Sequence, residues 1–124
     1  MNLEVVYKVL TAPEFAALRT GVFLGSAVDL ADGFVHLSTA AQLTGTVDRH
    51  FAGQRDLTVA AFDVRRLGGA LRWEVSRGGL PFPHLYAPLK LADAIAHGPL
   101  RREPDGSVQL PQSLPPAQGA AAQE

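Results

Sequence analysis

Two segments of the sequence repeat one pattern of aromatic, imidazole and hydroxyl side chains. The first reads FVHLS at residues 34–38, and the second reads FPHLY at residues 82–86. Side chains two positions apart share one face of a strand, so His36 and His84 each lie between an aromatic ring and a hydroxyl group. Two such faces form the walls of a pocket that offers a stacking surface and two groups that titrate near neutral pH. We therefore take His36 and His84 as candidate catalytic residues; a structural, partly buried histidine is the alternative for each.

Residues suited to holding an anion lie close to both segments. Ser38 and Thr39 stand directly before a predicted helix, and the free N–H groups at a helix N-terminus attract phosphate. Arg77 lies in SRGG at residues 76–79, where the glycines let the backbone approach a ligand closely. Ser38, Thr39 and Arg77 are therefore candidate binding residues. Helix capping and an ordinary turn explain the same positions without a ligand.

The composition excludes several other kinds of site. The 124 residues include 11 Lys and Arg against 12 Asp and Glu, a net charge of −1, which argues against an extended surface for nucleic acid or anionic membrane. Cysteine is absent, which removes disulfides, Cys-ligated zinc and a cysteine nucleophile. The histidines show no HxH or HxxxH spacing, and we expect no metal site. The sequence also lacks the P-loop, Rossmann and GxSxG patterns.

The composition predicts one folded domain followed by a tail. Apolar residues make up 47% of the chain, a globular balance, and the length leaves no room for a second core. We expect a single domain over residues 1–111 and a disordered tail, rich in Pro, Ala and Gln, over residues 112–124. The first residues lack the pattern of a secretory signal, and no apolar run reaches the ~18 residues of a membrane span. We therefore expect a cytoplasmic protein.

The elements that position the two histidine segments are strands and short helices. Capping boxes, T-x-x-E at residues 11–14 and T-x-x-Q at residues 39–42, predict helices that end near residues 18 and 51. Residues 21–33 are rich in Gly and Asp and predict a loop with turns. The Pro-Asp-Gly turn at residues 104–106 joins two short strands. Longer strands are predicted at residues 4–10, 33–38, 57–64, 71–75 and 81–89, so the fold class is mixed α+β.

Several longer segments together resemble a known bacterial family. They are YKVL, GSAVDLADGFVHLSTAAQ, HFAG, DLTV, LRWEVSRGG and FPHLYAPL. Over about residues 4–111 the chain resembles the family catalogued as domain of unknown function nine-fifty-two. The resemblance implies a fold similar to that of ADP-ribosyltransferases and RNA 2′-phosphotransferases. Such a fold is a curved, split β-sheet with two or three short helices that clasps NAD.

The resemblance also implies roles for individual residues. In proteins of this fold a strand-borne histidine contacts ribose hydroxyls of NAD, and His36 matches it. Tyr86, or Phe82 in second place, matches the aromatic residue that stacks on nicotinamide. Glu74 is the candidate for the carboxylate that holds a ribose hydroxyl, and Arg77 would hold the pyrophosphate together with the capped helix start. NAD is thus the implied cofactor, with ADP-ribosyl or 2′-phospho transfer as the implied activity.

Two other functions fit the same residues. His-Leu-Ser at residues 36–38 is similar to one half of the paired H-x-S/T motif of two-histidine phosphoesterases, and His-Leu-Tyr at residues 84–86 stands in place of the second half. In that interpretation His36 and His84 are the acid and base of a phosphoesterase or RNA-processing reaction. The third possibility is a non-catalytic module that senses a small-molecule nucleotide through the same pocket.

Overall fold

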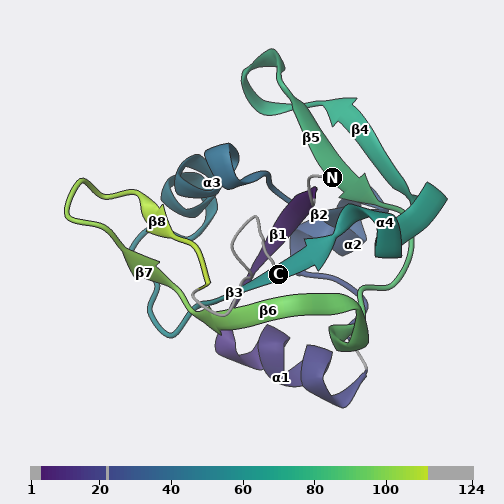
Figure 1. The fold of residues 1–124 in the computed structure, drawn as a ribbon, viewed down its shortest axis with the longest axis horizontal. Coiled ribbons are helices and arrows are strands. Elements are labelled where there is room, and N and C mark those ends of the chain that lie inside the picture. The colour runs from purple at the N-terminus through teal and green to yellow at the C-terminus, as the bar shows by residue number, and fades with distance from the viewer. Residues whose placement is uncertain (1–3, 22, 112–124) are drawn as a thin grey trace, which may run out of the picture.

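Figure 1 shows the computed structural model, which describes residues 4–21 and 23–111. These residues form antiparallel sheets and short helices, the mixed α+β class that the sequence predicts. The strands are β1 (Val5–Leu10), β2 (Val35–His36), β3 (Thr58–Asp63), β4 (Leu71–Val75), β5 (Pro81–Leu85), β6 (Ala94–Pro99), β7 (Arg101–Arg102) and β8 (Val108–Gln109). The α-helices are α1 (Ala12–Thr20), α2 (Ala27–Asp32), α3 (Leu43–His50) and α4 (Val64–Leu67).

Within the described ranges no helix is long and apolar enough to cross a membrane. The predicted tail, residues 112–124, lies outside them.

Three strands form the most buried sheet, which we call sheet A. Its order is β1-β3-β6, and both strand pairs are antiparallel. The central strand β3 is buried from Val59 to Asp63. The nearly continuous apolar run in the sequence predicts this burial, because a strand covered on both faces has no solvent face to keep polar.

The two histidine segments pair with each other in a second sheet, sheet B, of order β2-β5-β4. The antiparallel register places His36 opposite His84 on one side of β5, and Arg72 opposite His84 on the other. Side chains alternate between faces along each strand, so the even-numbered residues of all three strands share one face of sheet B. In Figure 1 the β4–β5 hairpin extends beyond the rest of the domain.

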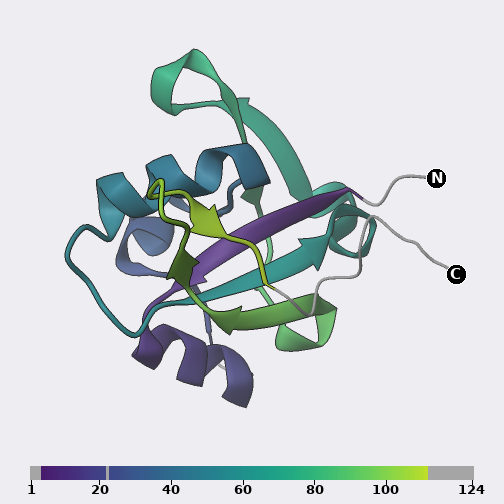
Figure 2. The ribbon, with the colours of Figure 1, turned by 60° about the vertical axis from the view of Figure 1, so that its left-hand side comes forward.

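Two apolar clusters hold the sheets and helices together. One lies between sheet A, α1 and the odd-numbered face of sheet B, and it includes Leu18, Val35 and Phe62. The other covers the opposite face of sheet A with α3 and β8, and it includes Leu43 and Val59. Figure 2 shows α1 and α3 on opposite sides of the strands of sheet A. Packing on both faces therefore fixes where α3 stands relative to the histidine strands.

The predicted loop over residues 21–33 is wrong, because α2 occupies Ala27–Asp32. Ser26 accepts a hydrogen bond from the backbone N–H of Asp29, and the Asp29 carboxylate accepts one from the N–H of Ser26. These bonds form a capping box, which starts a helix, and Gly33 ends it with φ of 85°. The described residues thus hold four short α-helices rather than two or three, and β6 is a strand that the sequence did not predict.

The two predicted capping boxes are present. Thr11 and Glu14 exchange hydrogen bonds at the start of α1, and Thr39 and Gln42 exchange them in the same way. The turn that follows Thr39 is a short 3₁₀ helix, which leads directly into α3. The Pro-Asp-Gly turn at residues 104–106 joins β7 to β8, as predicted.

Candidate functional site

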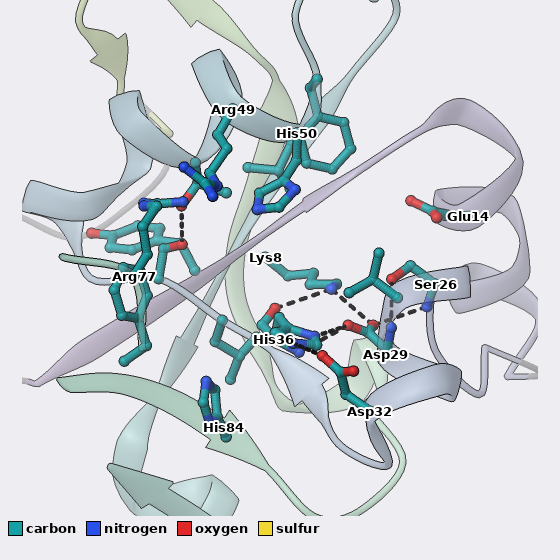
Figure 3. Close-up of a pocket in the computed structure, with 18 of the residues that line it drawn as sticks. Lys8, Glu14, Ser26, Asp29, Asp32, His36, Arg49, His50, Arg77 and His84 are labelled. Carbon is teal, nitrogen blue, oxygen red and sulfur yellow. Dashed lines mark hydrogen bonds and ion pairs between the residues drawn. The ribbon is translucent and has the colours of Figure 1, made fainter. Parts of the chain in front are cut away.

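The even-numbered face of sheet B forms one wall of a cleft of about 560 Å³. Residues of β1, α2 and α3 form its other walls, and the turn of the β4–β5 hairpin contributes Ser76 and Arg77 (Figure 3). The volume is in the range of ordinary small-molecule sites. Both sequence-predicted histidines, His36 and His84, line this cleft.

Asp29 joins three elements on the acidic side of the cleft. Its Oδ2 accepts a hydrogen bond from Lys8 Nζ at 2.9 Å, and its Oδ1 accepts one from the backbone N–H of His36 at 3.0 Å. The same Oδ1 lies 2.7 Å from Nδ1 of His36. Lys8 also donates to the carbonyl oxygen of His36 at 3.0 Å, and both Lys8 and Asp29 are buried. This ion pair is bonded on several sides, so its role is to fix the position of His36.

Both ring nitrogens of His36 face carboxylates. Burial by itself would raise the pKa of Asp29, but hydrogen bonds from His36 and the charge of Lys8 outweigh it and hold that pKa well below its usual range. On the other side of the ring, Nε2 lies 2.9 Å from Oδ2 of Asp32, whose side chain is about half exposed. A carboxylate only accepts, so both contacts are satisfied when the His36 ring carries both protons.

His84 has a different set of partners, although it lies directly opposite His36. Its Nδ1 is 2.7 Å from Oε1 of Glu74, and the same oxygen accepts a hydrogen bond from the Tyr86 hydroxyl at 2.8 Å. The bonds from His84 and Tyr86 lower the pKa of Glu74, and the bond to Glu74 raises the pKa of Tyr86. Because the Glu74 carboxylate accepts, Nδ1 carries a proton, and in the neutral form of the ring the lone pair lies on Nε2.

Phe34 packs against both histidines. Its ring is stacked on His84 with the centroids 4.1 Å apart, and it is tilted against His36 at 4.6 Å. The two imidazole rings are 5.5 Å apart, edge to face. The first aromatic residue of the repeated pattern therefore holds the two rings at a fixed spacing.

The opposite side of the cleft carries positive charge. Arg49 and His50 come from the end of α3 and Arg77 from the hairpin turn, and Figure 3 shows them away from Asp29 and Asp32. None of these three basic side chains has a carboxylate partner among the residues that the structure describes. Burial, and then the charges of Arg77 and Arg49, lower the pKa of His50. The lowered pKa favours the neutral form of His50, so Arg49 and Arg77 supply the positive charge at this edge, and arginine side chains are suited to anionic groups.

Gly45 lets Arg77 pack against α3. Arg77 donates to the Thr46 hydroxyl at 3.3 Å and lies 4.9 Å from the centre of the Phe82 ring. A Cβ on Gly45 would stand 3.3 Å from Nη2 of Arg77. A glycine inside a helix costs about 1 kcal/mol relative to Ala, and here it leaves room for the guanidinium group.

Four of the seven predicted site residues line the cleft. They are His36, Ser38, Arg77 and His84. Ser38 is buried and shares a hydrogen bond of 2.8 Å with the hydroxyl of Thr46. Because the same Thr46 hydroxyl accepts from Arg77, Ser38 and Arg77 are linked through α3.

The other three predicted residues lie outside the lining of the cleft. Thr39 caps Gln42, so its side chain and one free N–H group of the helix start are already used. Glu74 and Tyr86 bond to each other at the rim, where Arg72 lies 5.2 Å from the centre of the Tyr86 ring. Phe82, the second choice for the stacking residue, does line the cleft.

The sequence contained signals for residues that the prediction missed. Lys8 is a lysine inside the apolar strand Val5–Leu10, and a buried charge needs a partner. Asp29 is the third residue after Ser26, a spacing that forms a capping box with Asp in place of Glu or Gln. Together these signals indicate a buried pair next to the first histidine segment.

The cleft combines two kinds of chemistry. One wall holds His36, whose two ring nitrogens both contact carboxylates, and His84, whose Nε2 has no hydrogen-bond partner in the described chain. Imidazole groups of this kind are suited to acid–base chemistry. The other side holds cations that suit phosphate or carboxylate groups. In the described part of the chain, no group of three or more His, Asp or Glu side chains is arranged to hold a metal ion.

Comparison with known proteins identifies relatives of the same fold. The family model described as "Protein of unknown function (DUF952)" matches residues 9–97. The X-ray structure of protein CC0527 from Caulobacter crescentus is 44% identical, with a TM-score of 0.77 over 86% of this chain and 94% of that chain. A solution NMR structure of CC0527 is 43% identical, with a TM-score of 0.70 over 87% of this chain and 91% of that chain. No curated protein matches the chain.

Proposed function

The chain belongs to the DUF952 family, whose description assigns no activity, and we propose from its site that the cleft binds a phosphorylated nucleotide of the NAD or ADP-ribose class. One observation carries this proposal. In a single cleft, Arg49, His50 and Arg77 lie without a carboxylate partner, among the described residues, across from a polar wall centred on His36. A ligand with phosphates at one end and hydroxyl groups at the other complements both sides.

The cationic side supports the phosphate part of the ligand. Arginine binds phosphate through two parallel hydrogen bonds, and its charge persists at every physiological pH. Lys8 is not available for this purpose, because Asp29 already neutralises it. The anion therefore belongs near Arg49 and Arg77, where the positive charge has no internal partner in the described chain.

The remaining walls support the nucleoside part. The half-exposed carboxylate of Asp32 accepts hydrogen bonds, and ribose hydroxyls donate them. Phe51 and Phe82 give the cleft an apolar surface for a planar ring. A cleft of about 560 Å³ accommodates more than an isolated phosphate ion. These features favour a nucleotide over a simple inorganic anion.

Thermal unfolding tests the proposal with five ligands: NAD, ADP-ribose, nicotinamide, AMP and a 2′-phosphorylated nucleotide. A ligand at 100 times its Kd stabilises the protein by about 2.7 kcal/mol. We expect the largest shifts with ADP-ribose and NAD, a smaller shift with AMP and none with nicotinamide, which carries no phosphate. No shift with any of the five would rule out nucleotide binding.

Three variants locate the ligand. Arg77→Ala and His36→Ala remove one group from each side of the cleft, and each should abolish or strongly reduce the shift with ADP-ribose. Arg101→Ala is the matched control, because Arg101 is exposed on β7 and does not line the cleft. A shift that survives the first two variants and disappears in the control would place the ligand elsewhere.

Transfer of an ADP-ribosyl or 2′-phospho group is a further step that binding does not require. The carboxylate assigned to that step, Glu74, bonds His84 and Tyr86 and does not line the cleft. Product analysis after incubation with NAD, and with a 2′-phosphorylated RNA plus NAD, distinguishes the two cases. A transferase releases nicotinamide, whereas a sensing module binds its ligand and leaves it unchanged.

A further inference from the structure

We propose that the cleft hydrolyses a cyclic phosphodiester on the ribose of its nucleotide, with His84 as general base, His36 as general acid and Glu74 as the residue that positions His84. This inference rests on the proposed nucleotide binding and adds turnover to it. It follows from the different surroundings of two histidines that face each other across one strand pair.

His84 has one ring nitrogen bonded to protein and one that faces no partner in the described chain. The residue is only 4% exposed, and its Nδ1 is fixed by Glu74 at 2.7 Å. Glu74 is itself held by the Tyr86 hydroxyl, so the carboxylate that receives the bond from Nδ1 is fixed in place. In the described chain, Nε2 has no hydrogen-bond partner, and a buried polar atom without one costs free energy unless water or a ligand satisfies it. His84 lines the cleft next to His36 (Figure 3), and a ligand in the cleft would supply that partner.

His36 is held between two carboxylates, at 2.7 Å from Nδ1 and 2.9 Å from Nε2. The two carboxylates differ in one respect: the side chain of Asp29 is 1% exposed and that of Asp32 is 48% exposed. A ligand oxygen can therefore replace Asp32 at Nε2, while Asp29 keeps Nδ1 in place. His36 then presents a proton to the ligand.

The distance between the two histidine rings suits a single phosphoryl group. The two ring centroids are 5.5 Å apart on the same face of sheet B. Hydrogen bonds of ~2.6–3.2 Å from each ring can reach two oxygens on a single phosphorus atom. Arg77, from the turn of the hairpin, lines the same cleft and offers its guanidinium to the oxygens that carry the negative charge. The wall is therefore suited to one phosphoryl group held between acid and base.

The reaction balances with water as the only co-reactant. Water attacks phosphorus while Nε2 of His84 takes its proton. The bond between phosphorus and one ribose oxygen breaks, and that oxygen takes the proton from Nε2 of His36. The product is a phosphomonoester with a free neighbouring hydroxyl group, and a proton passes from His84 back to His36 through solvent. A five-membered cyclic diester is the favoured substrate because opening the ring releases strain.

Adenosine 2′,3′-cyclic phosphate is the test substrate, with the products 2′-AMP and 3′-AMP separated by chromatography. ADP-ribose binding is measured on the same preparations by calorimetry. We expect the wild type to form one of the two products in excess, since one ribose oxygen faces His36. Binding of ADP-ribose without ring opening overturns this proposal and leaves nucleotide binding intact. Absence of binding and of ring opening overturns both.

Variants assign the roles. His84→Gln should lower kcat by ~10²–10⁴-fold, as expected for loss of a general base. Glu74→Gln should lower kcat by about tenfold or more with KM little changed, because the ligand contacts remain while the carboxylate that keeps the proton on Nδ1 of His84 is lost. Glu103→Gln, an exposed glutamate beyond β7, is the matched control and should retain wild-type rates. If Glu74→Gln matches the control in kcat, Glu74 does not position the base. If His84→Gln also retains the rate, His84 is not the base.

Discussion

Sheets A and B have the same number of strands and the same antiparallel pairing, yet they place different chemistry in the interior. Sheet A has apolar clusters against both faces, and its central residue Phe62 is fully buried. Sheet B has an apolar cluster only against its odd-numbered face, and its even-numbered face lines the cleft. Sheet A therefore contributes most of the buried apolar surface that stabilises the fold. One face of sheet B is left outside the apolar clusters and carries His36 and His84.

Lys8 and Asp29 form a polar link between the two sheets. Lys8 is a charged residue of sheet A, and it bonds both Asp29 and the backbone of His36 in sheet B. Buried charge is stable only when it is paired and hydrogen-bonded, which is the case here. The pair therefore contributes to the stability of the fold, and its bonds also hold His36 in position.

The largest loss of stability should come from sheet A. Phe62→Ala removes a fully buried ring from the apolar cluster between the two sheets, and we expect a loss of about 3–5 kcal/mol in the free energy of unfolding. Urea denaturation followed by circular dichroism measures it. A loss of less than about 1 kcal/mol would mean that the central strand is not the main source of stability.

The second largest loss of stability should come from breaking the Lys8–Asp29 ion pair. Asp29→Asn leaves the Lys8 charge buried without its partner, and we expect a loss of about 3 kcal/mol. Adding Lys8→Met removes the unpaired charge, so the double variant should be more stable than Asp29→Asn alone. Denaturation of all four proteins gives the coupling energy. Simple additivity of the two single variants would contradict the pairing.

Acid should weaken the same link. The pKa of Asp29 is lower in the folded protein than its ordinary value of about 3.9 in an unfolded chain. The folded state therefore binds fewer protons in this range, so the contribution is complete above about pH 4 and is lost as the pH falls through the lower folded pKa. The wild type should lose stability more steeply than Asp29→Asn between about pH 4 and pH 2. Equal slopes in the two proteins would remove Asp29 as the cause.

The contrast between the sheets also explains what the sequence could predict. The apolar run of β3 and the alternation around His36 and His84 are local patterns, and all three strands lie where the sequence predicts them. β3 nearly fills its predicted range, whereas β2 covers only Val35–His36 of the predicted 33–38 and β5 only Pro81–Leu85 of 81–89. The repeated pattern even anticipated that the two histidines share a wall, because alternation alone decides which side chains share a face. β6 was missed because its sequence, AIAHGP, carries Gly and Pro and little apolar alternation.

The cationic side of the cleft could not be derived in the same way. Arg49 and His50 are remote in sequence from Arg77, and only the packing of α3 against sheet A brings them to one edge. The sequence does not show which side chains Glu74 contacts, and the register of β4 on β5 brings it to His84 and Tyr86. These are long-range contacts, which no periodicity along the chain encodes.

A smaller effect should come from the polar contact between sheet B and α3. Ser38→Ala removes the hydrogen bond to Thr46, and we expect a loss of about 1 kcal/mol, the usual contribution of one buried hydrogen bond. Thr46→Ser retains the hydroxyl group and is the control. A loss in the control as large as that in Ser38→Ala would assign the effect to packing of the methyl group instead.

The smallest effect on stability should come from Glu74, although its proposed effect on turnover is second only to that of the histidines. Glu74 lies at the rim with its side chain 39% exposed, so Glu74→Gln should shift the unfolding temperature no more than the control Glu103→Gln does. Thermal unfolding of both variants without ligand measures this. A marked drop in the unfolding temperature of Glu74→Gln alone would mean that the bond to His84 stabilises the fold. A lower kcat in that variant would then be explained by partial unfolding. Wild-type stability with a reduced kcat would separate the two roles and place Glu74 with the cleft rather than with the core.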